Sequence, residues 1–450
     1  MESITPVQPL SEVARVTLET PEALHIALQL HQKGVLKEAE MLYRRILDAA
    51  PDTLDTLHFL GLLCHQQNRH GEAAELIRRI ITIDPDNADA HNNLGNVLTG
   101  MERRAEAEAC YRKAIELNPG HANAYNNLGV ICFAQMRIDE AVEAYRKATE
   151  LAPDSVDFRY NLGNALRKSG ELNEAVRVYR EAIAISPEHN GAWQGLARTY
   201  LMSDRRDLAA EVYEEWLRLY PGDPAILFAL SACRGQDAPP RAPEAYISQV
   251  FDNMAERFDS HLESLEYRAP NLIGEALAEA LPHPAASLDI LDAGCGTGLC
   301  GPILRPYARR LTGTDLSNGM LTRAETRNSY DELVRAELTA FMGRHDESYD
   351  VIASSDTLCY FGDLEPVFRA GYKALKPGGF LAFTLEDSGD GGADSLLSPN
   401  CRYSHSRPYV EGELASAGLG VHSLSKVFLR NEAGEPVAGH LVVARKEPAA

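Results

Sequence analysis

Residues 288–298 read LDILDAGCGTG, an apolar run that passes directly into glycines at three alternate positions. The run is short and is bounded by glycine, which predicts a buried strand over residues 288–293. Gly294, Gly296 and Gly298 have no Cβ, so the chain can turn tightly and bring backbone N–H groups against a ligand. A helix beginning just after this loop would favour an electron-rich or anionic group at its N-terminus. The stretch therefore predicts a strand, a ligand-binding loop and a helix.

A carboxylate ends the next predicted strand, residues 310–315. Asp315 stands 21 residues after Gly294, where it can accept hydrogen bonds from both hydroxyls of a ribose. Further apolar runs alternate with amphipathic stretches, the pattern of a parallel α/β sheet. These predicted strands cover residues 349–354, 379–386, 421–430 and 438–445, with a weaker strand near 333–337.

The spacing of the glycines distinguishes between two classes of nucleoside cofactor. A dinucleotide-binding loop has the form G-x-G-x-x-G, whereas residues 294–298 have the form G-x-G-x-G. This loop, YDVI at residues 349–352 and LKPGG at residues 375–379 resemble the class I S-adenosylmethionine-dependent methyltransferases rather than nicotinamide oxidoreductases. The resemblance covers residues 245–447 and implies a Rossmann-like, seven-stranded domain that binds S-adenosylmethionine and releases S-adenosylhomocysteine. It includes residues 250–262, VFDNMAERFDSHL, as a helix that folds over the cofactor.

The resemblance also implies roles for individual residues. Those implied at the cofactor are Asp292, Gly294, Cys295, Gly296, Gly298, Asp315, Leu316, Glu337, Leu338, Ser355, Tyr246, Phe251 and Phe258. Asp315 would hold the ribose and Glu337 would meet the adenine edge, although many relatives carry Asp at the latter position. Cys295 is expected to be a packing residue, because methyl transfer needs no covalent enzyme intermediate. The sequence leaves open whether Asp292 only caps the loop and whether the two phenylalanines are ordinary core residues.

The candidate catalytic residues follow the fourth and fifth strands. Methyl transfer depends mainly on positioning, and a general base is needed only if the acceptor is protonated. Asp356, Tyr360 and His405, the last within RYSHS at residues 402–406, are the candidate bases. Neither N-P-P-Y nor D-P-P-Y follows the fourth strand, so oxygen, imidazole, carboxylate and amine acceptors stay open. No metal site is predicted.

The first half of the chain is a repeat of 34 residues. Its recurring positions are Pro51, Pro85, Pro119, Pro153, Pro187 and Pro221, Ala73, Ala107, Ala141, Ala175 and Ala209, and Gly61, Gly95, Gly129 and Gly163. Each unit predicts two antiparallel helices that approach at small residues, with proline ending the second helix. Because one pair cannot bury its apolar face alone, the units are expected to stack into a superhelix.

These positions resemble the tetratricopeptide repeat over residues 20–223. The resemblance implies six repeats, a closing helix at 224–233, and a concave face that binds a protein or peptide. Asparagine recurs at one repeat position and, in two units, also at the position before it: Asn93, Asn127 and Asn161, with Asn92 and Asn126. Similar ladders line the repeats of the O-linked N-acetylglucosamine transferases. These amides either grip the backbone of an extended peptide or bond to neighbouring helices, and the sequence leaves both open.

Composition limits the partners and the compartment. The 450 residues carry a net charge of −21, which disfavours nucleic-acid binding because that binding relies on Lys and Arg neutralising phosphates. No apolar run is long enough to span a membrane, and the opening MESITPVQPL predicts no secretory signal. Eight cysteines without disulfide or zinc-ligand spacing predict reduced thiols in a cytoplasmic protein.

We therefore expect a lead (residues 1–19), an all-α repeat superhelix (20–233), a stiff linker (234–244) and an α/β methyltransferase domain (245–447). The main hypothesis is a methyltransferase whose repeats recruit a protein or peptide. One alternative keeps the enzyme but gives it a small-molecule acceptor, with the repeats used for assembly. The other is a cofactor-binding scaffold without turnover. The oligomeric state does not follow from the sequence.

Overall fold

The computed structural model describes residues 20–281, 284–389, 393–432 and 434–448. The expected lead, residues 1–19, lies outside the described residues. The chain divides into two compact units, Met1–Thr199 and Tyr200–Ala450. This division falls within helix α11 (Asn190–Met202), ahead of the predicted linker.

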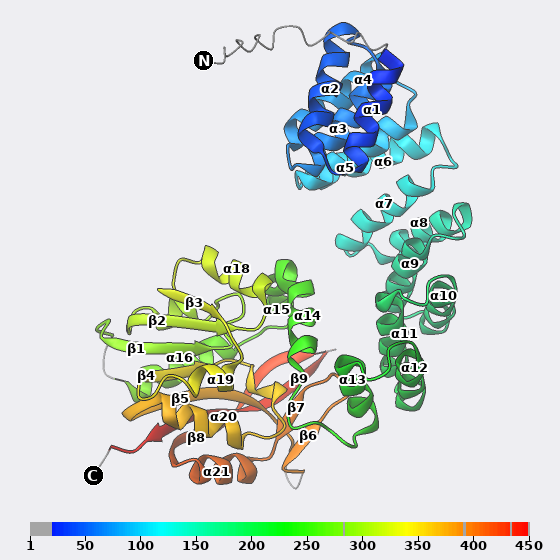
Figure 1. The fold of residues 1–450 in the computed structure, drawn as a ribbon. Coiled ribbons are helices and arrows are strands. Elements are labelled where there is room, and N and C mark those ends of the chain that lie inside the picture. The colour runs from blue at the N-terminus through cyan, green and yellow to red at the C-terminus, as the bar shows by residue number, and fades with distance from the viewer. Residues whose placement is uncertain (1–19, 282–283, 390–392, 433, 449–450) are drawn as a thin grey trace, which may run out of the picture. The chain divides into compact units, whose positions relative to one another are not determined.

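The first unit is a series of antiparallel helix pairs (Figure 1). Its helices are α1 (Thr20–Gln32), α2 (Leu36–Ala49), α3 (Leu54–Gln66), α4 (His70–Ile83), α5 (Ala88–Gly100), α6 (Arg104–Leu117), α7 (Ala122–Ala134), α8 (Ile138–Leu151), α9 (Val156–Ser169), α10 (Leu172–Ile185) and the greater part of α11. The second helix of each pair ends shortly before a repeat proline, as α2 does before Pro51, because proline has no N–H to continue the ladder. The predicted helix pairs are thus confirmed.

Glycine and tyrosine meet where the helices approach. A Cβ on Gly129 would lie 2.7 Å from the ring of Tyr145 in the second helix of the same pair. Tyr179 lies against Gly163 of its own pair and also against Gly195 of the next repeat, where an added Cβ would be 2.6 Å and 2.5 Å from its ring. The repeated glycines therefore make room for the tyrosines that join the helices.

The turn between the two helices of a repeat also recurs every 34 residues. The central residue of this turn has a positive φ in every repeat, from 53° to 89°. These residues are Gly34, Asn68, Glu102, Met136, Gly170 and Asp204. Glycine adopts this left-handed conformation without strain, whereas a side chain makes it unfavourable. Glu102 and Met136 are therefore strained positions that the sequence pattern did not predict.

The second unit begins with the end of α11 and continues with α12 (Arg206–Leu219) and α13 (Pro224–Arg234). Helix α13 is the predicted closing helix, and Asp223 caps it by accepting hydrogen bonds from the N–H groups of Ala225 and Ile226 at 2.8 and 3.1 Å. Proline at the first position of α13 is compatible with a helix start because no intrahelical bond is lost there.

The segment that the sequence predicts to be a linker is bound to the α/β domain. We call residues 239–242 the strap. The carbonyl of Pro240 accepts hydrogen bonds from the N–H groups of Gly362 and Asp363, each at 2.8 Å, and Ala242 N–H donates to the carbonyl of Tyr360 at 2.8 Å. The hydroxyl of Tyr403 donates to the carbonyl of the first strap residue, Pro239. Residues 239–242 of the segment predicted to be a stiff linker, 234–244, are therefore held against the α/β domain by these hydrogen bonds.

The rest of the second unit is a nine-stranded sheet of order β3-β2-β1-β4-β5-β7-β6, with β9 pairing both β5 and β8. The strands are β1 (Leu288–Ala293), β2 (Ala308–Asp315), β3 (Glu332–Arg335), β4 (Tyr349–Ser354), β5 (Leu375–Asp387), β6 (Ser395–Leu397), β7 (Tyr403–His405), β8 (Leu419–Glu432) and β9 (Glu435–Lys446). Strands β1 to β5 are parallel, and β9 runs antiparallel to β5 and β8. The predicted strands are present. The short β6 and β7 were not expected.

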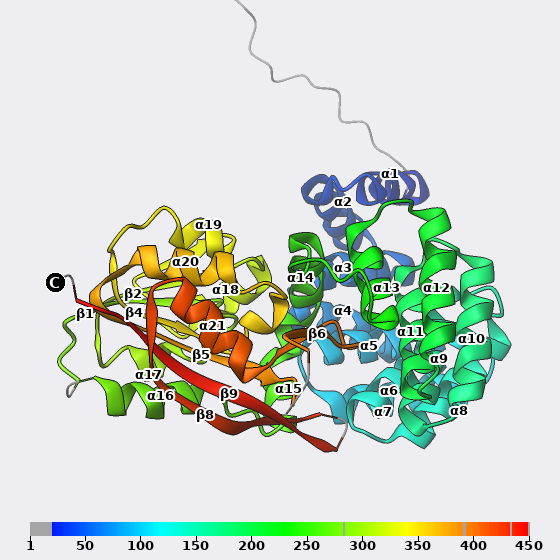
Figure 2. The ribbon, with the colours of Figure 1, turned by 90° about the horizontal axis from the view of Figure 1, so that it is seen from below.

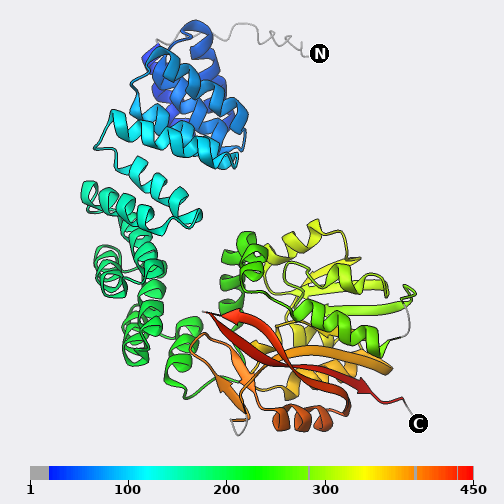
Figure 3. The same cartoon turned by 180° about the vertical axis from the view of Figure 1, so that it is seen from behind.

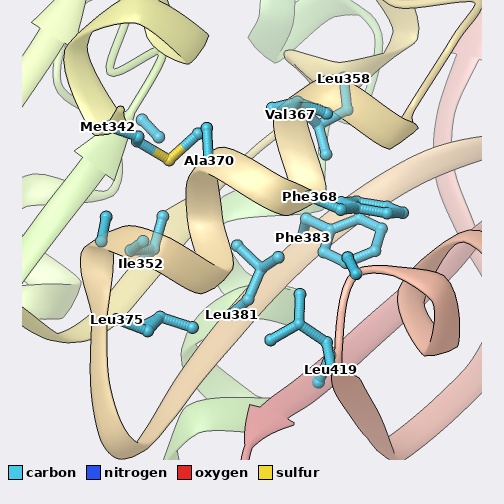
Figure 4. Packing of buried hydrophobic residues seen from close by; sticks show 14 of the residues in the cluster. Met342, Ile352, Leu358, Val367, Phe368, Ala370, Leu375, Leu381, Phe383 and Leu419 are labelled. Carbon is cyan, nitrogen blue, oxygen red and sulfur yellow. The ribbon is translucent and has the colours of Figure 1, made fainter. Parts of the chain in front are cut away.

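Helices cover both faces of the sheet (Figures 2 and 3). The helices of this part are α14 (Glu244–Met254), α15 (Phe258–Ser264), α16 (Ala269–Ala280), α17 (Gly301–Leu304), α18 (Asn318–Thr326), α19 (Leu338–Met342), α20 (Glu365–Ala374) and α21 (Arg407–Ser416). Apolar residues of α16 and α17 pack on one face, and those of α19, α20 and α21 pack on the other. Figure 4 shows the second core, where the rings of Phe368 and Phe383 lie 5.2 Å apart. Burial on both faces explains why the central strands are continuously apolar.

Candidate active site

A cavity of about 420 Å³ lies beside the carboxyl ends of β1, β2 and β4. This volume is in the range of small-molecule sites, and the carboxyl ends of parallel strands are where open α/β sheets bind ligands. The residues that follow β1, β2, β3 and β4 line one side of it, and helices α14 and α15 line another. Arg402, which precedes β7, and Arg430 on β8 complete the wall.

The glycine loop after β1 needs its glycines. Gly294, Gly296 and Gly298 have φ of 79°, 53° and 84°, which a side chain would make unfavourable. A Cβ on Gly294 would also lie 2.3 Å from Oγ1 of Thr357. Close to Gly296, by contrast, an added Cβ would meet only Phe258, at 3.9 Å. The loop is thus packed from behind at its first glycine and open at its second.

Asp315 at the end of β2 is positioned by backbone amides. Its Oδ2 accepts from Gly296 N–H and its Oδ1 from Ser317 N–H, both at 2.9 Å. Burial raises the pKa of Asp315, and the two amides offset part of that rise. Each carboxylate oxygen has a second lone pair, so the group can still accept hydrogen bonds from a ligand in the pocket that it lines.

Asp292 at the end of β1 is fully buried under the same pocket. Its Oδ2 accepts from the hydroxyl of Tyr330 at 2.6 Å, whereas its Oδ1 has no hydrogen-bond partner. Burial raises the pKa of Asp292 to about 7, although the Tyr330 hydrogen bond acts in the opposite direction. An unpartnered buried acceptor that also lines the cavity is suited to a donor on a bound ligand.

Two short helices cover the pocket in place of the single helix expected over residues 250–262. Helix α14 ends at Met254, a 3₁₀ turn follows over Ala255–Arg257, and α15 begins at Phe258. The rings of Phe251 and Phe258 meet edge to face at 5.8 Å, and both line the pocket. The lid therefore contributes two apolar rings to the pocket lining.

Two carboxylates, which the sequence did not reveal, anchor this lid. Asp252 accepts from Ser317 Oγ at 2.5 Å and from Gly319 N–H at 3.0 Å. Asp259 accepts from Thr297 Oγ1 in the glycine loop at 2.5 Å and also pairs with Arg327. Both helices are thus tied to the segments that follow β1 and β2.

Most of the predicted cofactor residues line this one cavity. They are Asp292, Gly294, Cys295, Gly296, Asp315, Leu316, Glu337, Leu338, Ser355, Phe251 and Phe258. Glu337 also caps α19 and pairs with Arg241 of the strap at 2.7 Å. Tyr246 and Gly298 are not part of the lining. Tyr246 packs on Phe228 of α13 with ring centroids 5.1 Å apart, and a Cβ on Gly298 would face Tyr330 at 3.0 Å.

Of the three candidate bases, Asp356 and Tyr360 line the pocket and His405 does not. His405 is fully buried and stacks on Tyr409 with centroids 5.8 Å apart. Burial lowers its pKa to about 4, so it is neutral at physiological pH. His405 therefore lies in the core of the domain, outside the pocket lining. Its position in a polar stretch of sequence concealed its burial in β7.

Asp356 belongs to a buried ionic cluster, which we define as Asp356, Glu386, Arg402 and Arg430. Arg402 binds both carboxylates, Asp356 and Glu386. Arg430 donates to Glu386 at 2.5 Å and lies 3.4 Å from the nearer oxygen of Asp356. Only Asp356 had been singled out from the sequence. The other three residues come from separate segments, β5, the residue before β7, and β8, so no single motif contains them.

The asparagines of the repeats form a continuous row in the first unit. Asn127 Nδ2 donates to Asn92 Oδ1 at 3.0 Å, and Asn161 Nδ2 donates to Asn126 Oδ1 at 2.9 Å. Weaker bonds of 3.3 and 3.4 Å join Asn92 to Asn93 and Asn126 to Asn127. The amides thus bond between the first helices of successive repeats. All except Asn92 keep partial exposure.

The structure also bears on disulfides, metal sites and membrane-spanning helices. All eight cysteines are free thiols. Over the described ranges, no three His, Cys, Asp or Glu side chains gather where they could ligate a metal. None of the helices in those ranges is both long and apolar enough to cross a membrane.

With this geometry established, comparisons with known proteins define the class of each part. Residues 291–383 match the family model described as a methyltransferase domain. Models of the tetratricopeptide repeat match residues 61–101, 86–154, 133–179 and 160–224. The chain is therefore an array of tetratricopeptide repeats followed by a methyltransferase domain, as its sequence predicted.

Individual relatives agree with this assignment. Methyltransferase-like protein 27 of Homo sapiens is 43% identical over 175 residues, which are 38% of this chain and 66% of the relative. Malonyl-[acyl-carrier protein] O-methyltransferase of Pseudescherichia vulneris is 29% identical over 143 residues, 32% of this chain and 54% of the relative. The chain thus spans less than two thirds of the length of both relatives.

The repeat array also resembles solved structures. The structure of Pseudomonas aeruginosa pilF covers 45% of this chain and 93% of its own, at 23% identity and a TM-score of 0.40. The assignment of the repeats rests on the family models.

Proposed function

We propose that this protein is an S-adenosylmethionine-dependent methyltransferase whose repeats bind a protein or peptide. The observation that supports the enzyme is the meeting of the glycine loop, Asp292 and Asp315 at one lidded cavity. When bound there, S-adenosylmethionine supplies an activated sulfonium methyl group. For this function we assign residues 20–233 to partner binding and residues 245–447 to catalysis.

The residues present fit this cofactor. Asp315 has free lone pairs for the ribose hydroxyls. Asp292 has an orphaned buried oxygen beside the loop, suited to a donor on the methionine part. Leu316 and Leu338, which line the same cavity, would flank the adenine. Phe251 and Phe258 would exclude water from the reacting groups, so the chain mainly binds and orients, as this chemistry requires.

Binding of S-adenosylhomocysteine tests the site. Isothermal titration of the full-length protein should show binding, and Asp315→Ala should weaken it at least tenfold, about 1.4 kcal/mol, because the ribose loses its acceptors. The matched control is Asp346→Ala, since the Asp346 side chain is 66% exposed and pairs only with Lys373 in the ion pairs described. No heat with the wild-type protein would contradict the proposal.

The asparagine row supports the proposed partner site. Amides that are already ordered by one another lose little entropy when they bind a peptide backbone. A triple variant with Asn93→Ala, Asn127→Ala and Asn161→Ala should therefore capture less of the partner protein from a cell extract than the wild-type protein does. Asn123→Ala is the control because Asn123 lies exposed on α7 outside the row. Equal capture by the triple variant would show that the row is only structural.

A second candidate function is methylation of a small molecule, with the repeats used for assembly. The name of one relative favours it, the ubiquinone biosynthesis O-methyltransferase of Hydrogenovibrio crunogenus. The two candidates differ in the product. Tritiated methyl groups transferred in a cell extract should remain with protein under the first proposal and with small molecules under the second. No transfer at all would favour a cofactor-binding scaffold.

A further inference from the structure

The ionic cluster of Asp356, Glu386, Arg402 and Arg430 is unequally exposed to the pocket. Both arginines line the cavity together with Asp356 and with Glu432, which pairs with Arg430, whereas Glu386 is not part of the lining. The Arg430 side chain is only 4% exposed and that of Arg402 only 14%. Glu386 thus binds both guanidinium groups from outside the pocket lining. Burial raises the pKa of Glu386, but Arg402 and Arg430 outweigh this effect and hold its pKa below the ordinary value.

One side of the Arg430 guanidinium is incompletely satisfied. Its Nη2 donates to Glu386 at 2.5 Å and to Glu432 at 2.9 Å. Its Nη1 reaches the two oxygens of Asp356 only at 3.4 and 3.5 Å, well beyond the roughly 2.7–2.9 Å of a charge-assisted hydrogen bond. A buried guanidinium nitrogen without a close acceptor is unfavourable, so an anionic oxygen bound in the pocket would stabilise it.

The same wall offers poor general bases. Burial raises the pKa of Tyr360 above its ordinary value, so its phenol stays protonated, and it accepts a hydrogen bond from Arg402 at 3.1 Å. Arg402 and Arg430 both engage the carboxylate of Asp356. Among the described residues that line the pocket, His261 is the only imidazole, and it is exposed on α15. The part of the pocket wall formed by Arg402 and Arg430, which we call the arginine wall, therefore offers no good general base to an acceptor that must lose a proton.

We propose that the methyl acceptor is a carboxylate, held at this wall by Arg402 and Arg430, and that the product is a methyl ester. The inference rests on the methyltransferase function proposed above. A carboxylate is already ionised at neutral pH, and its two oxygens match the fork of a guanidinium group. In the transfer, an oxygen lone pair forms the new O–CH₃ bond while the S–CH₃ bond breaks and its electron pair stays on sulfur. No proton has to leave, so no base is required.

Calorimetry on the full-length protein, saturated with S-adenosylhomocysteine, tests the arginine wall. The probes are glutarate and its neutral diamide, glutaramide. Glutarate should bind at least tenfold more tightly than glutaramide, and Arg430→Gln should remove this preference. Arg402→Lys should weaken glutarate binding as well, because lysine keeps the charge but loses the planar fork. The control is Arg407→Gln, since Arg407 is exposed and pairs with Glu411 on α21. Equal binding of the two probes by the wild-type protein would overturn the inference.

The chemical stability of the product supplies a second measurement. Label transferred from tritiated S-adenosylmethionine to acceptors in a cell extract should be released as volatile methanol by mild alkali, because methyl esters hydrolyse there. Label that resists alkali would overturn the carboxylate proposal while leaving the methyltransferase intact. Failure of the protein to bind S-adenosylhomocysteine would instead contradict the proposed function itself, so the two failures are distinguishable. Unchanged S-adenosylhomocysteine affinity in Arg430→Gln and Arg402→Lys shows that the variants fold.

Discussion

The repeat array and the methyltransferase domain obtain their contacts in different ways. In the array, Gly129 meets Tyr145 on the next helix, and the same contact recurs one repeat later between Gly163 and Tyr179. In the methyltransferase domain, Arg430 on β8 contacts Asp356, which lies 74 residues earlier in the sequence and just after β4. In the repeats, the residues that pack together recur at a fixed spacing in the sequence. The residues of the ionic cluster, by contrast, come together only when the sheet forms. Substitutions of the same kind should therefore have different consequences in the two parts.

The largest effect is expected for Gly294→Ala in the methyltransferase domain. A Cβ there would lie 2.3 Å from Thr357 Oγ1, and the backbone has a φ of +79°. The loop must move to relieve both conflicts, so the affinity for S-adenosylhomocysteine should fall at least 100-fold, about 2.8 kcal/mol. Isothermal titration measures the change. Gly412→Ala is the control, because no atom lies within 4 Å of its added Cβ on α21. Unchanged affinity in Gly294→Ala would show that the loop is more adaptable than its packing indicates.

Asp292→Asn tests a buried carboxyl that has no counterpart in the repeats. Its pKa is raised from 3.8 to about 7, so the native protein keeps a proton that the unfolded chain releases as pH rises between these values. Stability is therefore lost as pH rises through this range. Asparagine cannot ionise and can still accept from Tyr330. The variant should be more stable at about pH 8, by at most ~4 kcal/mol at ~1.4 kcal/mol per pKa unit.

Urea unfolding of both proteins at about pH 5 and about pH 8 measures this difference. The wild-type protein should lose stability relative to Asp292→Asn between the two conditions. Parallel pH dependence in the two proteins would contradict the raised pKa of Asp292.

In the array, Gly129→Ala should destabilise the fold by about 1–3 kcal/mol, the usual range for overpacking. Its Cβ would lie 2.7 Å from the Tyr145 ring, which is itself almost fully buried. Gly71→Ala on α4 is the matched control, since nothing lies within 4 Å of the added Cβ. It should stabilise by about 0.5–1 kcal/mol, because glycine is unfavourable inside a helix. Denaturant unfolding followed by circular dichroism compares them, and equal midpoints would contradict the close Gly–Tyr approach.

The fold was largely predictable from the sequence because its signals are local. The 34-residue period places the helix pairs, and the apolar runs place strands β1 to β5, β8 and β9. Features that depend on tertiary contacts could not be predicted from local patterns. The strap over residues 239–242 looks like a linker because it is rich in proline and charge, yet its backbone groups bond to residues 360–363. Strands β6 and β7 are too short to show a period.

The meeting of the glycine loop and Asp315 at one pocket was predictable for the same reason. The glycine loop and Asp315 are separated by one strand–helix–strand unit, so their spacing is fixed by local structure. The part of the pocket wall that carries Arg402 and Arg430 is assembled from distant segments, so the sequence did not show that these two arginines meet. Charged residues are usually exposed, so a sequence alone predicts that they lie on the surface. Only the pairing of strands shows that these two arginines are buried and directed at a cavity.

Methionine-to-glycine substitutions in the array should have the smallest effect on stability. The change in the free energy of unfolding should also have opposite signs at two matched sites. Met136 occupies the left-handed turn position with φ of 61° and is 64% exposed, so its side chain gains little from packing. Gly34 and Gly170 hold the same position in other repeats. A side chain in this conformation costs about 1–2 kcal/mol, and glycine loses about 0.5–1 kcal/mol more backbone entropy on folding. Met136→Gly should therefore stabilise the array by up to about 1 kcal/mol.

Met41→Gly is the matched control, because Met41 is 61% exposed but lies within α2. There the same substitution should destabilise by about 1 kcal/mol, the cost of glycine inside a helix. Urea midpoints of the two variants should move in opposite directions from that of the wild-type protein. A loss of stability in both would mean that Met136 contributes packing that outweighs its backbone strain, and that the repeated turn conformation is not what limits stability at this position.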